Sequence, residues 1–289
     1  MNPRLSGALY VAISATAFGA MAIFARQAYA GGADVMAVLL LRFVIAAVLM
    51  TGFMLATGRR WPRGRNLLLL ASMGGLCYVA QSMSFFSALK YASAGLVALL
   101  LYLYPFIVTV LGAIVLRQRL GRQRLLPVLA ALFGTALTLG GGFAGEARGV
   151  ALGLTAALVY AIYTLVGGRV LMYEDALASA TVVMIAAAAV FIGLAGWQQP
   201  AFPHTALAWA AIAAIAVVCT VVAMLTYFLG IRQLGAADAA TLSTLEPAVT
   251  IVLAAFFLDE AFAPLQAIGA VIILAAVVWL TRMGARHNG

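Results

Sequence analysis

Residues 241–260 read "TLSTLEPAVTIVLAAFFLDE", a strongly apolar stretch that places a carboxylate, Glu246, beside Pro247. A second stretch, "LLLYLYPFIVTVLGAIVLRQ" at 99–118, has Pro105 at the matching place in the first half of the chain. A helix that is hydrophobic all round is buried in a protein core or in lipid. The proline recurs in both stretches and the carboxylate does not, so the two halves of the chain share a backbone plan and differ in charge.

The composition indicates an integral membrane protein. Hydrophobic residues make up 66% and charged residues 9% of the 289, and the mean hydropathy is +1.11, whereas a soluble chain is about half apolar and a quarter charged. A helical span needs roughly 20 mostly apolar residues, and the apolar runs are too long for the alternating strands of a membrane barrel. The sequence predicts an all-α membrane protein with ten transmembrane helices, at about 6–25, 35–57, 67–88, 94–116, 125–144, 149–168, 176–197, 206–229, 239–258 and 265–281.

The chain repeats itself at a constant offset, the one that takes Pro105 to Pro247. Residues 77–118 align without a gap to residues 219–260. The other identical pairs include Cys77 with Cys219 and Phe86 with Phe228. We therefore predict two five-helix repeats, 1–145 and 146–289, and because five is odd the second repeat is inverted. Inverted repeats are a recurring plan of secondary transporters, whose substrate site lies near the midplane beside broken helices.

The net charge of +9 comes from basic residues that lie mostly on alternate connections. The predicted inner side holds Arg4 and the clusters within 59–65 and 117–124, whereas the outer side holds Arg26, Lys90 and Arg148. Because positive residues concentrate on cytoplasmic loops, both termini are predicted to be cytoplasmic. The sequence has no polybasic tail and no basic residues interleaved with aromatic ones, so we expect no nucleic-acid partner.

Several other function classes lack their characteristic residues. Cys77 and Cys219 lie inside predicted helices and are expected to be packing residues, not a disulfide. His204 and His287 are isolated, so no metal or other cofactor is predicted. The sequence has no phosphate-binding loop, so no ATPase activity or subunit is implied. The first apolar segment has a counterpart at 149–168 and is interpreted as a helix, not a signal peptide.

Pro105 and Pro247 each remove a backbone hydrogen bond and bend their helix. In lipid the freed carbonyl needs another partner or a wet cavity. We therefore expect both prolines to mark helix breaks that line or gate a cavity. The alternative is a kink that only improves packing.

Polar side chains form stripes at helical spacing. Such stripes should face protein or water, because buried polar groups cost free energy in lipid unless they are hydrogen-bonded. The stripes are Tyr78, Gln81, Ser82 and Phe85 on the third helix, Tyr160, Tyr163 and Thr164 on the sixth, and Ser243, Pro247 and Thr250 on the ninth. Tyr78, Tyr102 and Tyr163 lie too deep in their predicted helices for an interfacial aromatic belt. The predicted substrate-binding residues are Tyr78, Gln81, Tyr102, Tyr163, Ser243, Thr244 and Glu246.

Two ionisable residues lie within predicted spans. Glu246 is roughly 12 Å from the inner end of its helix at about 1.5 Å per residue, and Arg42 lies at a similar depth from the outer end of the second helix. An intramembrane charge is a functional hypothesis, although an arginine can reach the surface and a lone carboxyl can stay protonated. Glu246 is expected to bind an ammonium group or to carry a proton, and the role of Arg42 is left open.

With ten helices in inverted repeats and the segment "TLEPAVTIVLAAFFLDEAFAPLQAIGAVIILAAVVWL" at 244–280, the sequence resembles the EamA-type exporters of the drug/metabolite transporter superfamily. Glu260, Gln266 and Gly269 match the family pattern, whereas Arg117 and Gln118 stand where an acidic residue is usual. Within the superfamily the chain is similar to bacterial amino-acid exporters. The resemblance implies that helices 1, 3, 4, 6, 8 and 9 surround a central cavity and that the protein is a monomer.

The resemblance implies a secondary transporter that exports amino acids, including aromatic or other apolar ones, and related small metabolites across the inner membrane by alternating access. The alternative is a proton-coupled exporter of cationic drugs or quaternary amines. An enzyme acting on lipid would need paired carboxylates or a histidine cluster at the membrane surface, and the sequence has neither. A purely structural role would not call for an inverted repeat with paired helix breaks.

Overall fold

The computed structural model describes residues 3–88, 91–92, 97, 100–115, 122–138, 146–257 and 264–285. These residues fold into helices, which satisfy the backbone hydrogen bonds that lipid cannot. The first half contains α1 (Pro3–Gly19), α2 (Met21–Ala30), α3 (Val35–Ala56), α4 (Gly64–Ser72), η1 (Met73–Tyr78), α5 (Val79–Ala88), α7 (Tyr104–Val115) and α8 (Arg122–Thr138). The second half contains α9 (Ala147–Val170), α10 (Ala176–Gln198), α11 (Ala206–Ala216), η2 (Val217–Val222), α12 (Ala223–Leu234), α13 (Ala236–Leu242), α14 (Leu245–Phe257) and α15 (Pro264–Ala285).

The helices account for the ten predicted spans, and the all-α prediction is confirmed. Six continuous segments are long and apolar enough to cross a membrane: Pro3–Ala30, Val35–Ala56, Gly64–Phe85, Ala147–Val170, Ala176–Gln198 and Ala206–Leu234. α7, α8 and α15 contain shorter apolar stretches, and the ninth span is divided into α13 and α14. Several residues discussed from the sequence lie outside the described residues, namely Lys90, Arg117, Gln118, Glu260 and His287.

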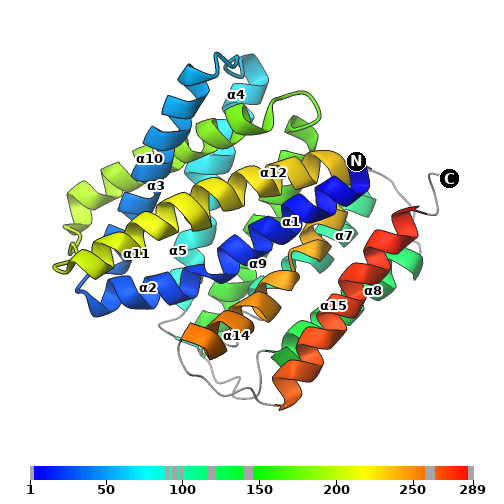
Figure 1. The fold of residues 1–289 in the computed structure, drawn as a ribbon. Coiled ribbons are helices and arrows are strands. Elements are labelled where there is room, and N and C mark those ends of the chain that lie inside the picture. Colours follow the sequence, from blue (N-terminus) through cyan, green and yellow to red (C-terminus); the bar gives the residue numbers. More distant parts are fainter. Residues whose placement is uncertain are drawn as a thin grey trace.

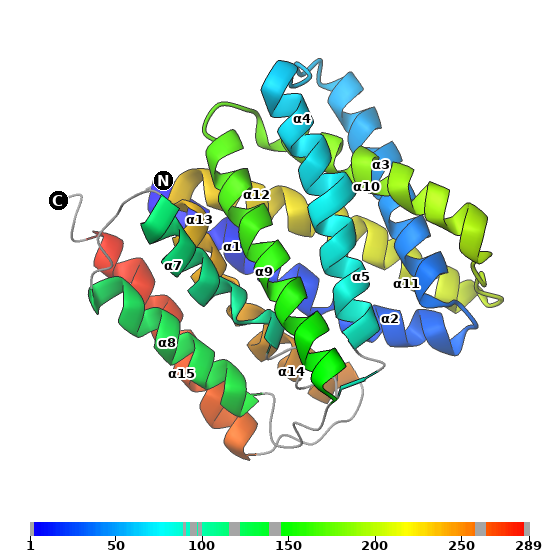
Figure 2. The same ribbon diagram turned by 180° about the vertical axis from the view of Figure 1, so that it is seen from behind.

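The two halves pack against each other with the symmetry of an inverted repeat. α1 lies along α12, and α5 lies along α9, so the first span of each half packs against the third span of the other. α3 pairs with α10, and α8 pairs with α15 at one side of the molecule (Figures 1 and 2). Each of these four contacts joins one half to the other, so neither half is a separate globule.

Glycines at equivalent positions permit this close packing. A Cβ on Gly7 would lie 2.8 Å from the Leu234 side chain, and one on Gly149 would lie 2.8 Å from the Cβ of Ala92. The offset of the repeat takes Gly7 to Gly149, and it also takes Ala92 to Leu234. Small residues let membrane helices approach closely. The same helix contact is therefore built twice, so the internal repeat extends from sequence to packing.

Helix interruptions also occur in pairs. η1 and η2 are π-helical segments in the third and eighth spans. Turns at 102–103 and 243–244 divide the fourth and ninth spans just before Pro105 and Pro247. A proline N cannot donate to the carbonyl four residues earlier, and the Ser243 carbonyl instead accepts from the Glu246 N–H at 3.0 Å. Each proline thus lies in the first turn of the helix that follows a break, and a role in gating stays a prediction.

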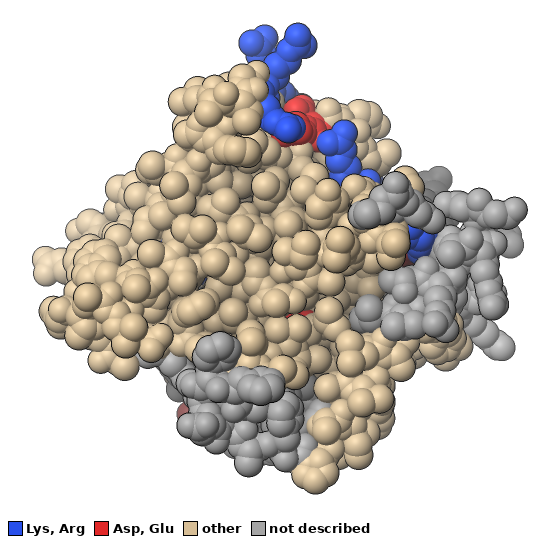
Figure 3. All heavy atoms as spheres, viewed as in Figure 1, with Lys and Arg blue, Asp and Glu red and all other residues tan. Residues whose placement is uncertain are grey.

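One face of the molecule carries the start of α1 and the end of α15, and we call it the terminal face (Figure 1). Lys and Arg side chains gather at this end, whereas the broad flank seen in Figure 3 is largely free of charge. Arg4 forms an ion pair with Asp238 at 2.9 Å, which ties α1 to α13. Arg59 pairs with Asp175, and Asn66 donates to Glu174 at 2.7 Å, which ties the α3–α4 connection to the start of α10.

The close approach of η1 to α10 gives a stability prediction. A Cβ on Gly74 would lie 2.2 Å from the Val183 carbonyl oxygen, a backbone atom that cannot move aside. Gly74→Ala should lower the free energy of unfolding by about 1–3 kcal/mol, the usual cost of overpacking. Thermal unfolding in detergent measures the effect.

Gly52 on α3 is the matched control, because a Cβ there would meet open space. Gly52→Ala should be neutral or stabilise the helix by up to about 1 kcal/mol. Equal melting temperatures for the two alanine variants would contradict the packing of η1 against α10.

Candidate functional site

A cavity of about 140 Å³ lies among the interrupted helices. Its wall consists of Phe18, Met21, Arg42, Tyr78, Gln81, Ser82, Phe85, Leu101, Tyr102, Tyr160 and Glu246. This volume is well below the about 300–1,000 Å³ of pockets for drug-sized ligands. In this conformation the cavity therefore suits a small polar group.

Arg42 forms part of the cavity wall and is held by both π-helical segments. Its side chain extends from α3 and is only 4% exposed. The Nε–H donates to the Thr220 hydroxyl of η2 at 3.1 Å, and a terminal nitrogen donates to the Tyr78 hydroxyl of η1 at 3.2 Å. The offset of the repeat takes Tyr78 to Thr220. Equivalent positions of the two repeats thus hold one arginine, in keeping with the frequent use of π-bulges at functional sites.

Further contacts fix the Arg42 guanidinium in place. The Thr220 hydroxyl donates to the Ile215 carbonyl at 2.8 Å, so its oxygen lone pairs are available to Arg42. The other terminal nitrogen lies 3.3 Å from the Met21 sulfur, and the guanidinium lies 4.8 Å from the ring centre of Phe43. An arginine at the centre of a membrane helix costs about 3 kcal/mol on insertion scales, and these contacts offset part of that cost.

Glu246 lines the same cavity from the first turn of α14. It follows the helix break at 243–244 directly, and Tyr102 lies at the equivalent break of the first repeat. The Tyr102 hydroxyl hydrogen-bonds the Glu246 carboxyl group. A helix N-terminus favours negative charge. The two breaks therefore bring a carboxyl group and a phenol to the wall that also carries Arg42.

A layer of stacked tyrosines, Tyr104, Tyr160, Tyr163 and Tyr227, lies beside the cavity. Tyr160 belongs to both, because it lines the cavity and its ring centre lies 4.5 Å from that of Tyr104 and 5.9 Å from that of Tyr163. From Tyr227, α12 continues to Leu234, which packs against Gly7 near the start of α1. The tyrosine layer thus lies between the cavity and the terminal face.

Three predicted substrate-binding residues do not belong to the cavity wall. Tyr163 is 1% exposed, and its hydroxyl lies 3.2 Å from the Met224 sulfur within the tyrosine layer. The hydroxyl groups of Ser243 and Thr244 donate to the carbonyls of Ala239 and Thr241 at 3.0 and 2.7 Å. These bonds pair the backbone at the break, so both side chains point back to their own helix. The other four predicted residues, Tyr78, Gln81, Tyr102 and Glu246, share the cavity.

Sequence patterns gave little sign of the remaining wall residues. Phe18 and Met21 flank the break at Ala20 between α1 and α2, and Leu101 precedes the break at 102–103. On an apolar helix such side chains are indistinguishable from those that face lipid. By contrast, Ser82, Phe85 and Tyr160 lie on the predicted stripes, because polar residues at helical spacing do leave a signal.

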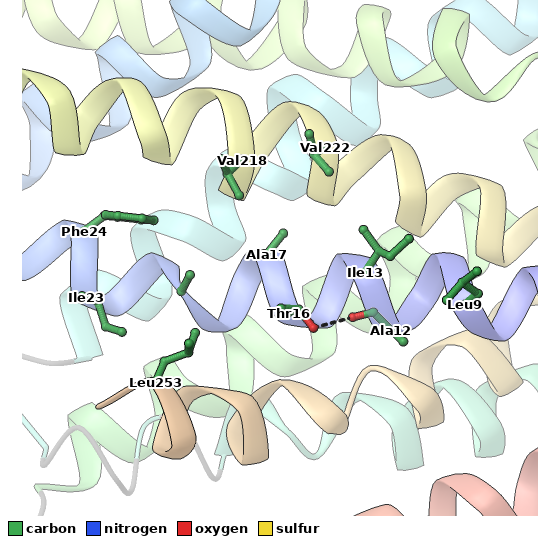
Figure 4. Close-up of a pocket in the computed structure, with 11 residues that line it drawn as sticks. Leu9, Ala12, Ile13, Thr16, Ala17, Ile23, Phe24, Val218, Val222 and Leu253 are labelled. Atoms are coloured by element: carbon green, nitrogen blue, oxygen red, sulfur yellow. Dashed lines mark hydrogen bonds between the residues drawn. The ribbon is translucent and has the colours of Figure 1, made fainter. Parts of the chain in front are cut away.

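A larger, apolar crevice of about 630 Å³ lies along another face of α1 and α2 (Figure 4). Val218 and Val222 border it on one side and Leu253 on the other. Among the described residues that line it, Thr16 has the one polar side chain, and its hydroxyl donates to the Ala12 carbonyl at 2.9 Å. A site for a polar solute needs convergent polar groups. The smaller cavity therefore has the chemistry of a binding site, and the larger crevice has that of a lipid-facing surface.

Neither cysteine forms a disulfide: Cys77 and Cys219 are free and lie in η1 and η2. Within the described residues, no three His, Cys, Asp or Glu side chains come together to form a metal site.

Comparisons with known proteins agree with this architecture. The model of the EamA-like transporter family matches residues 5–140 and again residues 147–282. The chain is 30% identical to the uncharacterized transporter YcbK of Bacillus subtilis (strain 168), over 91% of this chain and 89% of the relative. It is 23% identical to the uncharacterized transporter YyaM of the same organism, over 82% and 81% of the two chains. A solved crystal structure superposes with a TM-score of 0.84 at 20% identity and covers 98% of this chain and 99% of its own.

The difference between wall and buried residues can be tested by thiol labelling. In a chain with Cys77 and Cys219 replaced by alanine, Gln81→Cys should react with a water-soluble thiol reagent at least about tenfold faster than Ser243→Cys, since labelling requires exposure. Gln81 lines the cavity, whereas Ser243 is buried and bonded to its own helix. Equal labelling rates would show that Ser243 also faces the cavity.

Proposed function

Because the chain belongs to the EamA-like transporter family, we propose that this integral membrane protein exports amino acids and related small metabolites by alternating access. Aromatic or other apolar amino acids are the favoured substrates. The observation that carries the proposal is the cavity at the interface of the inverted repeats, where aromatic rings surround a carboxyl group. Rings of this kind suit an apolar side chain and attract an ammonium group by cation–π contact.

The arrangement of the helix breaks supports a secondary transport mechanism. Inverted-repeat transporters bind substrate at broken helices near the midplane and move one repeat against the other. Here the turns at 102–103 and 243–244 place Tyr102 and Glu246 at the cavity. Each repeat contributes one break, so an exchange of conformation between the repeats would change access from one face to the other.

In the alternating-access mechanism that we propose, the present conformation is closed toward the terminal face. The tyrosine layer and the Arg4–Asp238 ion pair both lie on that side of the cavity. Opening would separate α1 from α13 and part the stacked rings. With the basic connections inside, the terminal face would be cytoplasmic and the membrane the inner membrane. We propose that a monomer carries out this cycle.

Counterflow in liposomes tests the proposed substrate class. Liposomes that contain the purified protein and are preloaded with an unlabelled amino acid should take up the same radiolabelled amino acid in a saturable manner. A facilitative exporter should give the same counterflow with and without an imposed pH gradient. Protein-free liposomes are the control, and absence of flux for every amino acid tested would contradict the proposal.

A second candidate function follows from Glu246 itself. A carboxyl group in a membrane cavity is also the requirement for proton-coupled export of cationic drugs or quaternary amines. Replacing the Glu246 carboxyl group by an amide separates the two candidate functions, because an amide of the same shape cannot carry a proton. Under the amino-acid proposal, Glu246→Gln should retain flux but bind substrate about tenfold more weakly, through loss of one charged contact. Complete loss of flux, together with gradient-driven uptake of cations by the wild type, would favour the drug exporter.

A further inference from the structure

Arg42 is a charged group of the cavity that the proposed function does not yet use. Within the described part of the chain its hydrogen-bond partners are all neutral: the Thr220 and Tyr78 hydroxyls and the Met21 sulfur. None of these described contacts brings a negative charge to the buried guanidinium. Buried charges are normally paired, so an anionic group that enters the cavity would find a strong partner.

The donors of Arg42 define the kind of anion. A guanidinium has five N–H donors arranged in a planar fork, and three of them contact Thr220, Tyr78 and Met21. Within the described chain this leaves one N–H on each terminal nitrogen for a ligand. Two donors on neighbouring nitrogens match the two oxygens of a carboxylate.

Glu246 supplies the opposite charge in the same wall. A space of about 140 Å³ that contains both a guanidinium and a carboxyl group matches a small head group with both signs of charge. A simple cation would be attracted to Glu246 and repelled by Arg42 within the same small volume. The apolar part of the wall, Phe18, Phe85 and Leu101, is left for an uncharged side chain.

We propose that Arg42 binds the carboxylate of the substrate while Glu246 faces its ammonium group, so that the cavity selects zwitterionic amino acids with apolar side chains. This inference rests on the proposed function and assigns a binding role to Arg42. The equivalent positions Tyr78 and Thr220 orient the guanidinium from the two repeats and are positioning residues. The carboxylate site would therefore respond to a relative movement of the repeats.

The test uses competitors that share one skeleton and differ in their charged groups. Counterflow of radiolabelled L-phenylalanine is measured in liposomes containing the full chain. The competitors are L-phenylalanine, 2-phenylethylamine, which lacks the carboxylate, and 3-phenylpropionate, which lacks the ammonium group. In the wild type, the intact amino acid should compete far better than either analogue. If L-phenylalanine gives no counterflow, L-leucine with 3-methylbutylamine and 4-methylpentanoate replaces the series.

Arg42→Met should lower the apparent affinity for the amino acid by about 10- to 100-fold, which corresponds to the loss of a charge-assisted bond. Competition by the amine should stay unchanged or improve, because the repelling charge is gone. Arg42→Lys keeps the positive charge but lacks the planar pair of N–H donors, so it should give an intermediate affinity. Glu246→Gln should lower the apparent affinity for the amino acid, through loss of the contact with its ammonium group, and leave competition by the acid unchanged. Arg65→Met is the control, since Arg65 is exposed near the start of α4 and away from the cavity.

The outcomes separate the two proposals. If Arg42→Met weakens the amine and the amino acid equally, or leaves the amino acid unaffected, Arg42 does not bind the carboxylate and the proposed function stands. If the wild type transports the amine but neither amino acid, or transports none of these compounds, the proposed function and this inference both fail. Thermal unfolding shows whether each variant is folded. If Arg42→Met does not fold, Arg42→Lys replaces it. A ratio of amine competition to amino-acid competition higher than in the wild type would then support the carboxylate role of Arg42, and an unchanged ratio would contradict it.

Discussion

Lipid offers no hydrogen-bond partners, and this constraint decides where the helices of this protein can be interrupted. A break that faced lipid would leave carbonyl and N–H groups unpaired at a cost of several kcal/mol each. The breaks at 102–103 and 243–244 and the π-helical segments η1 and η2 accordingly contribute residues to the cavity or contact its wall. Ser243 and Thr244 show how the chain meets the constraint, because their hydroxyls pair with carbonyls of the preceding turn.

A symmetric backbone thus supports an asymmetric set of charges. Tyr78 and Thr220 occupy equivalent positions and both contact Arg42, although the arginine comes from the first repeat alone. Glu246 comes from the second repeat, and its equivalent in the first is Tyr104, a member of the tyrosine layer. Two related halves can therefore move alike while the cavity between them presents one cationic and one acidic side.

The residues that pack the two halves together differ from those that, in the proposed mechanism, close the cavity toward the terminal face. Gly7 lets α1 approach Leu234 at the end of α12, and Gly149 lets α9 approach Tyr91 and Ala92 just after α5, so both contacts join the halves. The tyrosine layer lies between the cavity and the terminal face, and the partly buried Arg4–Asp238 ion pair ties α1 to α13 at that face. Each aromatic ring pair contributes about 1 kcal/mol beyond the area that it buries, so in the proposed mechanism the rings can part at moderate cost.

The sequence by itself determined the all-helical membrane fold, the inverted repeat and the position of both prolines at breaks, because hydropathy, internal alignment and the missing proline N–H are local properties of the chain. Four of the residues that it predicts to bind substrate, Tyr78, Gln81, Tyr102 and Glu246, line the cavity, since polar side chains deep in apolar helices tend to face protein or water. Only the tertiary structure showed that Tyr163, Ser243 and Thr244 lie behind the wall and that Arg42 belongs to it. Periodicity gives the face of a helix but not its neighbour, and whether a polar group bonds its own backbone or meets a cavity depends on packing between segments far apart in the chain.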